Sequence, residues 1–435
     1  MSSHNPQSNY KCEEFVADDV TSNKSNVTRK MLIKEYRKIG HGAFGTVVQA
    51  YITPDKETWY GPFAIKKVPA QTEYKSRELQ ILRMTNHPNV VKLEYFFTHL
   101  SPQDHKVYQH LAMECLPETL QIEINRYVTN RLELPLKHIK LYTYQIARAM
   151  MYLHSMGICH RDIKPSNILV NPESGVLKIC DFGSAKRLEP DAPSISYICS
   201  RFYRAPELIL GCTNYTTQID IWGLGCVIGE MLLGQAVFQG QEPLLQFREI
   251  SKLLGPPAKK FIFFSNPSYD GPLFSKPLFT GTSKERFEKY FSHAGTDGID
   301  LLMKVLVYDP VERLQPKNIL AHSFFDDLRN EKYFLPRGKT QPILLPNLFD
   351  FDDLELKILG DLIENIKPNY SINTNGSNEA NENSNNNNNN NNNTNNNNAN
   401  NNITSTPPPN FNTSDSTPVT SNTNSNDNSN NTNNP

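Results

Sequence analysis

The apolar residues of this chain follow two patterns, one typical of strands and the other of helices. Residues 46–52 (TVVQAYI) and 63–68 (FAIKKV) are short runs rich in β-branched and aromatic residues, with a turn signal at 54–55 between them. Such runs predict strands. Residues 73–84 (EYKSRELQILRM) instead place leucine and isoleucine near helical spacing among strong helix formers. This part of the chain is therefore predicted to combine strands with one helix.

Farther along the chain, the pattern changes to long helical segments. Residues 134–157 predict one helix, and residues 217–234 (TQIDIWGLGCVIGEMLLG) predict a second that is apolar on nearly every face and therefore buried. Asp220, near the start of the second helix, is expected to be buried and to cap backbone groups near residues 160–167. The sequence thus predicts an α+β fold of two lobes, a β-rich N-terminal lobe with one helix and a mainly helical C-terminal lobe.

Composition sets the limits of the folded part. From about residue 371 to residue 435 the sequence is asparagine with Ser, Thr and Pro. Little in that segment is apolar enough to offset the entropy lost on ordering it, so a disordered tail is predicted. We divide the chain into a flexible N-terminal extension (1–32), a folded domain (33–328), a C-terminal extension (329–370) and a disordered Asn-rich tail (371–435).

Charge and cysteine content exclude several classes of protein. The chain has 435 residues, a formal net charge of −1 and 20% charged residues, so no basic field points to nucleic acid. Its seven cysteines contain no CxxC pair, which favours reduced thiols. The N-terminus lacks the apolar core of a signal peptide, and no run of about 18 apolar residues could span a membrane. We expect a cytoplasmic or nuclear protein that binds neither nucleic acid nor membranes.

Three linked segments carry the strongest chemical signal. They are HRDIKPSN at 160–167, CDFG at 180–183 and RAPE at 204–207. Each would be weak alone, but in this order and spacing they resemble the catalytic segments of the protein kinase family. The resemblance implies the bilobal protein kinase fold and transfer of phosphate from ATP to proteins. It also implies that Asp162 is the catalytic base and that Asn167 and Asp181 bind Mg²⁺.

An upstream glycine-rich segment is consistent with this resemblance. The segment IGHGAFGTV forms the pattern GxGxxG with Gly40, Gly42 and Gly45. Glycine lets the backbone approach phosphate oxygens closely. A dinucleotide-binding loop would open a helix, whereas a strand follows here. Lys66 in FAIK resembles the kinase lysine that neutralises the α- and β-phosphates, and Glu78 on the predicted helix is its expected partner.

The resemblance extends to the rest of the nucleotide site. The predicted ATP-binding residues are Ile39, Gly40, Gly42, Gly45, Val47, Ala64, Lys66, Met113, Glu114, Leu116, Leu169 and Cys180. Glu114 and Leu116 would offer backbone hydrogen bonds at the hinge, and Cys180 would line the pocket beside the metal site. ATP and Mg²⁺ are the implied cofactors.

Other segments narrow the resemblance. Lys164, two residues after Asp162, is typical of serine/threonine kinases. The segments SYICSRFYRAPE (196–207), LPET (116–119) and SRELQILR (76–83) resemble the glycogen synthase kinase family, and the similarity covers about residues 33–328. Mitogen-activated kinases would carry Thr-x-Tyr, but Ile195 stands two residues before Tyr197. Cyclin-dependent kinases would carry a PSTAIRE-like helix, which this sequence lacks.

The family resemblance also implies a site for a phosphate. In that family, two arginines and a lysine hold a phosphate already present on the substrate, four residues C-terminal to the new site. The matching positions are Arg77, Arg161 and Lys186. Three cations placed together need an anion. The alternative is that a phosphorylated Ser194 or Ser196 of the chain's own activation segment fills the pocket, and a related kinase without a priming preference also stays open.

Further roles follow from the resemblance. Tyr197 matches an activating phosphotyrosine, which Arg201 and Arg204 would pair; otherwise it is a packing tyrosine. Glu207 is expected to pair with Arg313.

One region departs from the family. Residues 256–296 differ from the family's scaffold-binding region, so a scaffold at the C-terminal lobe is expected without an identity. The aromatic residues of that region form either an exposed patch or part of the core; they are Phe261, Phe263, Phe264 and Phe274. A pseudokinase scaffold is the remaining alternative, and it is disfavoured because Lys66, Asp162, Asn167 and Asp181 are all present.

Overall fold

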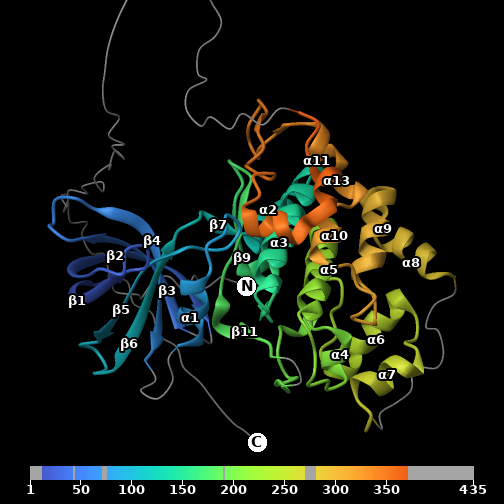
Figure 1. The fold of residues 1–435 in the computed structure, drawn as a ribbon, viewed down its shortest axis with the longest axis horizontal. Helices are drawn as coiled ribbons and strands as arrows, with labels where there is room; N and C mark the ends of the chain where they lie inside the picture. The colour runs from blue at the N-terminus through green and yellow to red at the C-terminus, as the bar shows by residue number, and fades with distance from the viewer. Residues whose placement is uncertain (1–11, 43–44, 71–75, 190–191, 270–280, 371–435) are drawn as a thin grey trace, which may run out of the picture. The chain divides into compact units, whose positions relative to one another are not determined.

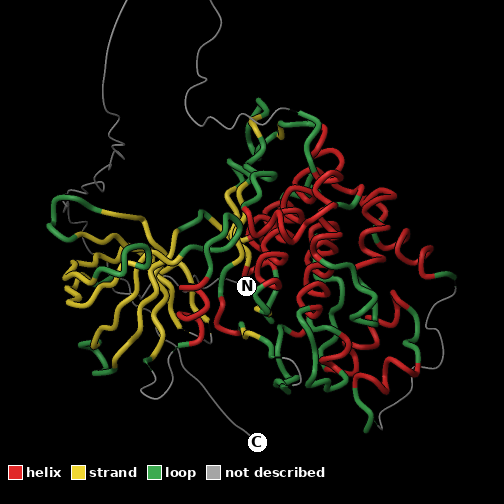
Figure 2. Tube along the Cα trace, viewed as in Figure 1, coloured by secondary structure: helices red, strands yellow, loops and turns green. Residues whose placement is uncertain are grey.

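The computed structural model of the chain describes residues 12–42, 45–70, 76–189, 192–269 and 281–370. The predicted disordered tail, 371–435, lies outside the described residues. Within them, a β-rich lobe that contains one helix precedes a mainly helical lobe, as the sequence predicted (Figures 1 and 2).

The N-terminal lobe is an antiparallel barrel. Its strands are β1 (Glu14–Ser22), β2 (Thr28–Gly42), β3 (Gly45–Thr53), β4 (Tyr60–Pro69), β5 (Leu93–Leu100) and β6 (Val107–Glu114). They close in the order β1-β2-β3-β4-β6-β5, because Thr21 and Ser22 of β1 pair with Phe96 and Tyr95 of β5. Closure removes the exposed edges that an open sheet would present.

The prediction of a flexible N-terminal extension (1–32) was wrong for the second half of that range. Residues 14–22 form β1, and β2 begins at Thr28. Ala17 and Val20 are buried, and the ring of Phe15 stacks on His99 with centroids 4.2 Å apart. A bulge between Ala17 and Val20 interrupts the alternation of side chains in β1. A bulge disrupts the period of two from which a strand is predicted, so this strand gave only a weak signal.

The helix of the N-terminal lobe is α1 (Arg77–Met84). The Ser76 side chain accepts a hydrogen bond from the backbone N–H of Leu79, which caps the helix. Ile81 and Leu82 are buried. The helix thus lies within the predicted range of 73–84, of which residues 73–75 fall outside the described part of the chain.

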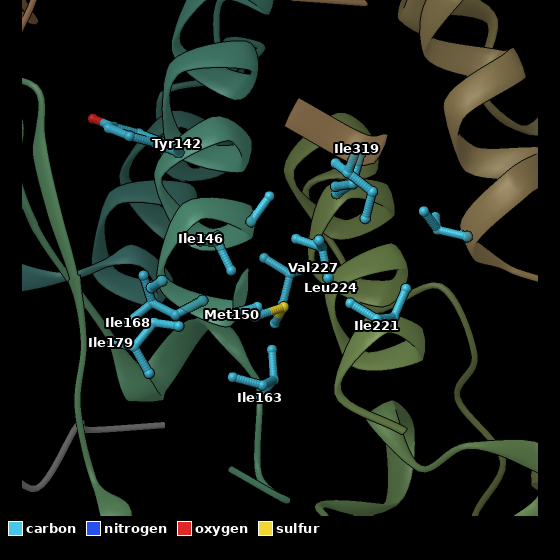
Figure 3. Packing of buried hydrophobic residues seen from close by; sticks show 14 of the residues in the cluster. Tyr142, Ile146, Met150, Ile163, Ile168, Ile179, Ile221, Leu224, Val227 and Ile319 are labelled. Atoms are coloured by element: carbon cyan, nitrogen blue, oxygen red, sulfur yellow. The ribbon is translucent and has the colours of Figure 1, made fainter. Parts of the chain in front are cut away.

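The C-terminal lobe is built around two long helices. Its helices are α2 (Leu120–Thr129), α3 (Leu136–Ser155), α4 (Pro206–Ile209), α5 (Gln218–Leu233), α6 (Pro243–Leu254), α7 (Lys259–Ser265), α8 (Ser283–Tyr290), α9 (Gly295–Val305), α10 (Pro316–Leu320), α11 (Asp326–Asn330), α12 (Asp353–Leu359) and α13 (Ile363–Ile366). Figure 3 shows Met150 of α3 packed toward Leu224 and Val227 of α5. As predicted, α5 is almost wholly buried. Among the described residues, no helix combines the length and apolarity needed to cross a membrane.

Seven short strands follow the barrel in the described part of the chain and form small sheets of their own. They are β7 (Glu118–Thr119), β8 (Ile158–Cys159), β9 (Ile168–Asn171), β10 (Val176–Ile179) and β11 (Lys186–Arg187), with β12 (Tyr333–Phe334) and β13 (Ile343–Leu344) near the C-terminus. In the sheet β10-β9-β7, β9 and β10 pair as a hairpin that leads into the CDFG segment. The pair β8 and β11 sets Lys186 opposite Cys159, next to the HRDIKPSN segment.

The C-terminal extension packs on α3 through a buried ion pair. Arg148 of α3 donates from Nε and Nη2 to the two carboxylate oxygens of Glu355 on α12, each at 2.7 Å. His87, in the loop after α1, lies 3.1 Å from the same carboxylate. Burial alone would raise the pKa of Glu355, but hydrogen bonds from Arg148 and His87 lower it to about 2. The extension is therefore part of the folded domain and also contacts the loop that follows α1.

Candidate active site

A cavity of about 440 Å³ lies between the glycine-rich strands, the hinge and the HRDIKPSN segment. The predicted ATP-binding residues that line it are Ile39, Gly40, Gly45, Val47, Ala64, Lys66, Met113, Glu114, Leu116, Leu169 and Cys180. Gly42, the remaining one, ends β2 and pairs with Gly45 across the ladder. The cavity is also lined by residues that sequence reasoning missed: His41, Val91, Cys115, Thr119 and Ser166. His41, Thr119 and Ser166 lie inside the quoted motifs but at positions to which the prediction gave no role, and Val91 and Cys115 lie outside those motifs.

Glycine is required at Gly45. Its φ is +136°, and a Cβ built there would lie 2.1 Å from the carbonyl oxygen of Lys67 on β4. No L side chain fits such a contact without moving the strand. The glycine therefore brings β3 close to β4 at the roof of the cavity.

Lys66 lies between two carboxylates. Its Nζ is 2.7 Å and 2.8 Å from the two oxygens of Glu78 and 2.8 Å from Oδ1 of Asp181. Burial alone would lower the pKa of Lys66, but the two carboxylates more than offset it and raise that pKa. The ammonium thus stays charged inside the cavity. The ion pair that the sequence predicted between Lys66 and Glu78 is present.

The carboxylate of Asp162 is held by hydrogen bonds on both of its oxygens. Oδ2 accepts from Lys164 Nζ at 2.8 Å and from Asn167 Nδ2 at 2.9 Å. Oδ1 accepts from the backbone N–H and the hydroxyl of Ser200, at 3.0 Å and 2.8 Å. Burial raises the pKa of Asp162, but Lys164 and Ser200 hold it below its ordinary value. The group is therefore ionised and fixed in orientation at neutral pH.

Ser200 was missed by sequence reasoning. Its hydroxyl donates to Asp162 and accepts from Lys164 Nζ at 2.8 Å, so it joins the two residues. It lies in SYICSRFYRAPE (196–207), which carried the family resemblance, but nothing in that segment marked this serine for a role. A single serine is a weak signal, because serine is common in loops.

The HRDIKPSN segment is anchored from below by Asp220 of α5. Its carboxylate accepts the backbone N–H groups of His160 and Arg161, each at 2.8 Å, and lies 3.0 Å from His154. Asp220 is buried, as predicted, and caps the expected backbone. Arg161 adopts a left-handed φ of 65°, which the Asp220 contacts stabilise.

The three predicted phosphate-binding cations are only partly brought together. Arg161 is 5% exposed and donates to the Ser184 carbonyl and to the hydroxyl of Tyr215. Lys186 donates to the hydroxyl of Ser194 at 2.7 Å, in the same segment that Tyr215 contacts. Arg77 is exposed at the start of α1, a helix that packs against the turn at 182–184. Arg161 and Lys186 therefore contact the same segment, directly or through Tyr215, whereas no hydrogen bond among the described residues ties Arg77 to it.

The activation segment is held by an ion pair at Glu207 and by contacts of two arginines near Tyr197. Arg313 donates to both oxygens of Glu207, at 2.7 Å and 2.6 Å, in the pair that the sequence predicted. Tyr197 is 72% exposed, and the Arg204 guanidinium lies 4.4 Å from its ring centroid. Arg201 instead donates to the Gln241 carbonyl. The pairing of a phosphate on Tyr197 by both arginines stays a prediction.

The aromatic residues predicted in the region 256–296 differ in their exposure to solvent. Phe261 is buried in the core, whereas its neighbours Phe263 and Phe264 on α7 are 67% and 62% exposed. Phe274 lies outside the described residues. The exposed patch is thus smaller than the predicted set, and the scaffold contact in this region stays a prediction.

Comparison with known proteins gives the family. Residues 33–325 match the protein kinase domain. Protein kinase MCK1 of Saccharomyces cerevisiae is 79% identical over 355 residues, which cover 82% of this chain and 95% of that relative. The glycogen synthase kinase-3 homolog YGK3 of the same yeast is 46% identical over 359 residues (82% and 94%), and glycogen synthase kinase 1 of Pyricularia oryzae is 41% identical over 358 residues (82% and 89%). The chain therefore belongs to the glycogen synthase kinase family of serine/threonine protein kinases.

Proposed function

We propose that this kinase prefers protein substrates that already carry a phosphate four residues C-terminal to the new site. The observation that supports this most directly is an uncompensated charge. In the described part of the chain, neither Arg161 nor Lys186 forms an ion pair with a carboxylate, although Arg161 is 5% exposed. A buried cation without an anion is unfavourable. A phosphate supplied by the substrate would remove that penalty.

The metal site is proposed at Asp181 and Asn167. The Asn167 amide nitrogen donates to the carbonyl and the carboxylate of Asp162. Among the described residues, no hydrogen bond uses the amide oxygen of Asn167. That oxygen and the Asp181 carboxylate are ligands of the kind Mg²⁺ prefers. When bound, Mg²⁺ would neutralise the phosphate oxygens of ATP.

The remaining residues take roles in the transfer step. Asp162 accepts the proton of the attacking serine or threonine hydroxyl, because its carboxylate is ionised and held in place. As the new O–P bond forms and the bond from the γ-phosphorus to ADP breaks, Lys66 compensates charge on the α- and β-phosphates. Lys164 lies beside Asp162 and can stabilise charge at the reacting oxygen.

Replacing Lys164 by methionine should shift the acid limb of the pH profile. Lys164 lowers the pKa of Asp162, so its removal raises that pKa and protonates the base at a higher pH. The midpoint of the acid limb of kcat/KM should therefore move upward, along with a loss of rate. Lys339→Met is the control, because Lys339 is a half-exposed surface residue. An unchanged acid limb in Lys164→Met would contradict the role of Lys164.

The priming preference is tested with Arg77→Ala and two peptides that differ only in a phosphoserine four residues beyond the target. The protein is first treated with a serine/threonine-specific phosphatase. Charge-assisted hydrogen bonds contribute roughly 1.5–3 kcal/mol each, so kcat/KM for the primed peptide should fall about ten- to a hundredfold. The unprimed peptide should change little.

Arg187→Ala is the matched control for the phosphate site. Arg187 neighbours Lys186 in β11, and its exposed side chain points to the opposite side because side chains alternate along a strand. It should leave the ratio of the two kcat/KM values unchanged. Equal loss on both peptides in Arg77→Ala would exclude the priming preference and leave a kinase without it.

A further inference from the structure

Ser194 lies beside Lys186, one of the predicted phosphate-binding cations. Its hydroxyl accepts the hydrogen bond of Lys186 at 2.7 Å, and its backbone N–H donates to the Thr213 carbonyl at 2.8 Å. The residue is 8% exposed. One hydroxyl thus occupies the position on Lys186 that a phosphate oxygen would take.

Arg161 belongs to the same cluster through Tyr215. The Tyr215 hydroxyl accepts from Nη1 of Arg161 at 3.0 Å and donates to the carbonyl of Ile195, the residue after Ser194, at 3.1 Å. Lys186 thus contacts Ser194 directly and Arg161 reaches the neighbouring Ile195 through Tyr215, and neither cation has a carboxylate partner among the described residues. Of the two serines in this segment, only Ser194 has a hydrogen bond to Lys186 in the described structure.

The segment that carries Ser194 lies at the surface. Ala192 and Pro193 are exposed before it, and Ile195 is 73% exposed after it. No helix or strand includes residues 192–200. Ser194 itself is buried within this segment, with its side chain on Lys186 and its backbone N–H on Thr213. A modifying enzyme needs to displace only this short segment.

We propose that Ser194 is a phosphorylation site, and that its phosphate occupies the Arg161 and Lys186 pocket from within the chain. In the modification, Ser194 Oγ forms a bond to the γ-phosphorus of ATP, the bond from that phosphorus to ADP breaks, and the hydroxyl proton passes to the base of the modifying kinase. The tethered phosphate then excludes the phosphate of a primed substrate. The consequence for primed substrates rests on the function proposed above, whereas occupancy of the pocket does not.

The first experiment asks whether Ser194 accepts phosphate. Full-length Asp162→Asn protein is dephosphorylated and incubated with ATP and either the wild-type chain or a cell extract. Mass spectrometry is expected to locate phosphate on Ser194, and the signal at this position should vanish in the Asp162→Asn, Ser194→Ala double variant. An unmodified Ser194 under both conditions overturns the proposal.

The second experiment asks where the phosphate lies. Phosphoserine is installed at position 194 during translation of the full chain, and its second ionisation is followed by ³¹P NMR. Free phosphoserine titrates near pH 6. Pairing with two cations should lower this pKa by about one unit or more. Lys186→Ala should recover part of the shift, and Arg187→Ala should not. A pKa near 6 in the folded chain overturns the proposal.

The third experiment measures the effect on specificity. With phosphoserine at 194, kcat/KM for the primed peptide should fall about ten- to a hundredfold relative to the unmodified chain. The kcat/KM for the unprimed peptide should change less than about threefold. The ratio of kcat/KM for the primed peptide to that for the unprimed peptide should therefore fall. A preserved ratio contradicts exclusion of the primed substrate. If the unmodified chain shows no primed preference while the ³¹P shift is present, the proposed function fails and the occupied pocket stands.

Discussion

Asp162→Asn is expected to lower kcat by about 10²- to 10⁴-fold, the range that general base catalysis usually supplies. The asparagine keeps the shape of the side chain but cannot take the proton of the attacking hydroxyl. The cavity that would bind ATP is otherwise unchanged, because Lys66, Glu78 and Asp181 form their contacts without Asp162.

Two measurements separate chemistry from binding for this variant. Phosphorylation of a generic peptide reports the chemical step, and binding of a fluorescent nucleotide reports the cavity. The dissociation constant for the nucleotide should stay within about threefold of the wild-type value, since the change is less than about 1 kcal/mol. A wild-type kcat in Asp162→Asn would show that Asp162 is not the general base.

Glu355→Gln is expected to lower the free energy of unfolding by roughly 3 kcal/mol, because the buried Arg148 loses its buried carboxylate and keeps only Asp350, whose side chain is 47% exposed. Arg148 and Glu355 are each 1% exposed in their side chains. The fall of the Glu355 pKa from 4.5 to about 2 corresponds by itself to about 3 kcal/mol. The melting temperature should drop on the order of 10 °C.

The pH dependence of this loss has a definite sign. The folded state holds the Glu355 pKa below its unfolded value, so the stabilisation is complete above about 4.5 and is lost as pH falls toward 2. The difference in melting temperature between Glu355→Gln and wild type should therefore be constant from pH 7 to about pH 5.5. Glu364→Gln is the control, since its pair with Lys367 is exposed and contributes roughly 1 kcal/mol or less. Equal melting temperatures for the two variants would show that the buried pair does not hold the extension.

Local chemistry made much of the site predictable. Asp162, Asn167 and Asp181 lie in short segments whose order along the chain already indicates their roles. The burial of α5 could be predicted because its sequence is apolar on nearly every face. Ser200 could not be found in this way. Its contact with Asp162 joins residues 38 positions apart, and no periodic pattern marks it.

The ends of the domain were harder to predict for the same reason. Strand β1 pairs along its length with β2 and, at Thr21 and Ser22, with β5 more than 70 positions later, and its own sequence contains Asp18 and Asp19 beside a bulge. The bulge and the two aspartates weaken propensity and periodicity, and the closing pairs with β5 leave no local signal at all. The extension after residue 328 likewise gave no sign that α12 would hold a residue of α3.

The pair of Arg148 and Glu355 also determines when the domain can finish folding during synthesis. The two residues are 207 positions apart in the chain. At typical rates of about 5–20 residues per second, Arg148 leaves the ribosome about 10–40 s before its partner does. Throughout that interval the nascent α3 carries a charge that the finished molecule buries. The face of α3 that carries Arg148 is therefore expected to stay solvated until α12 has been made.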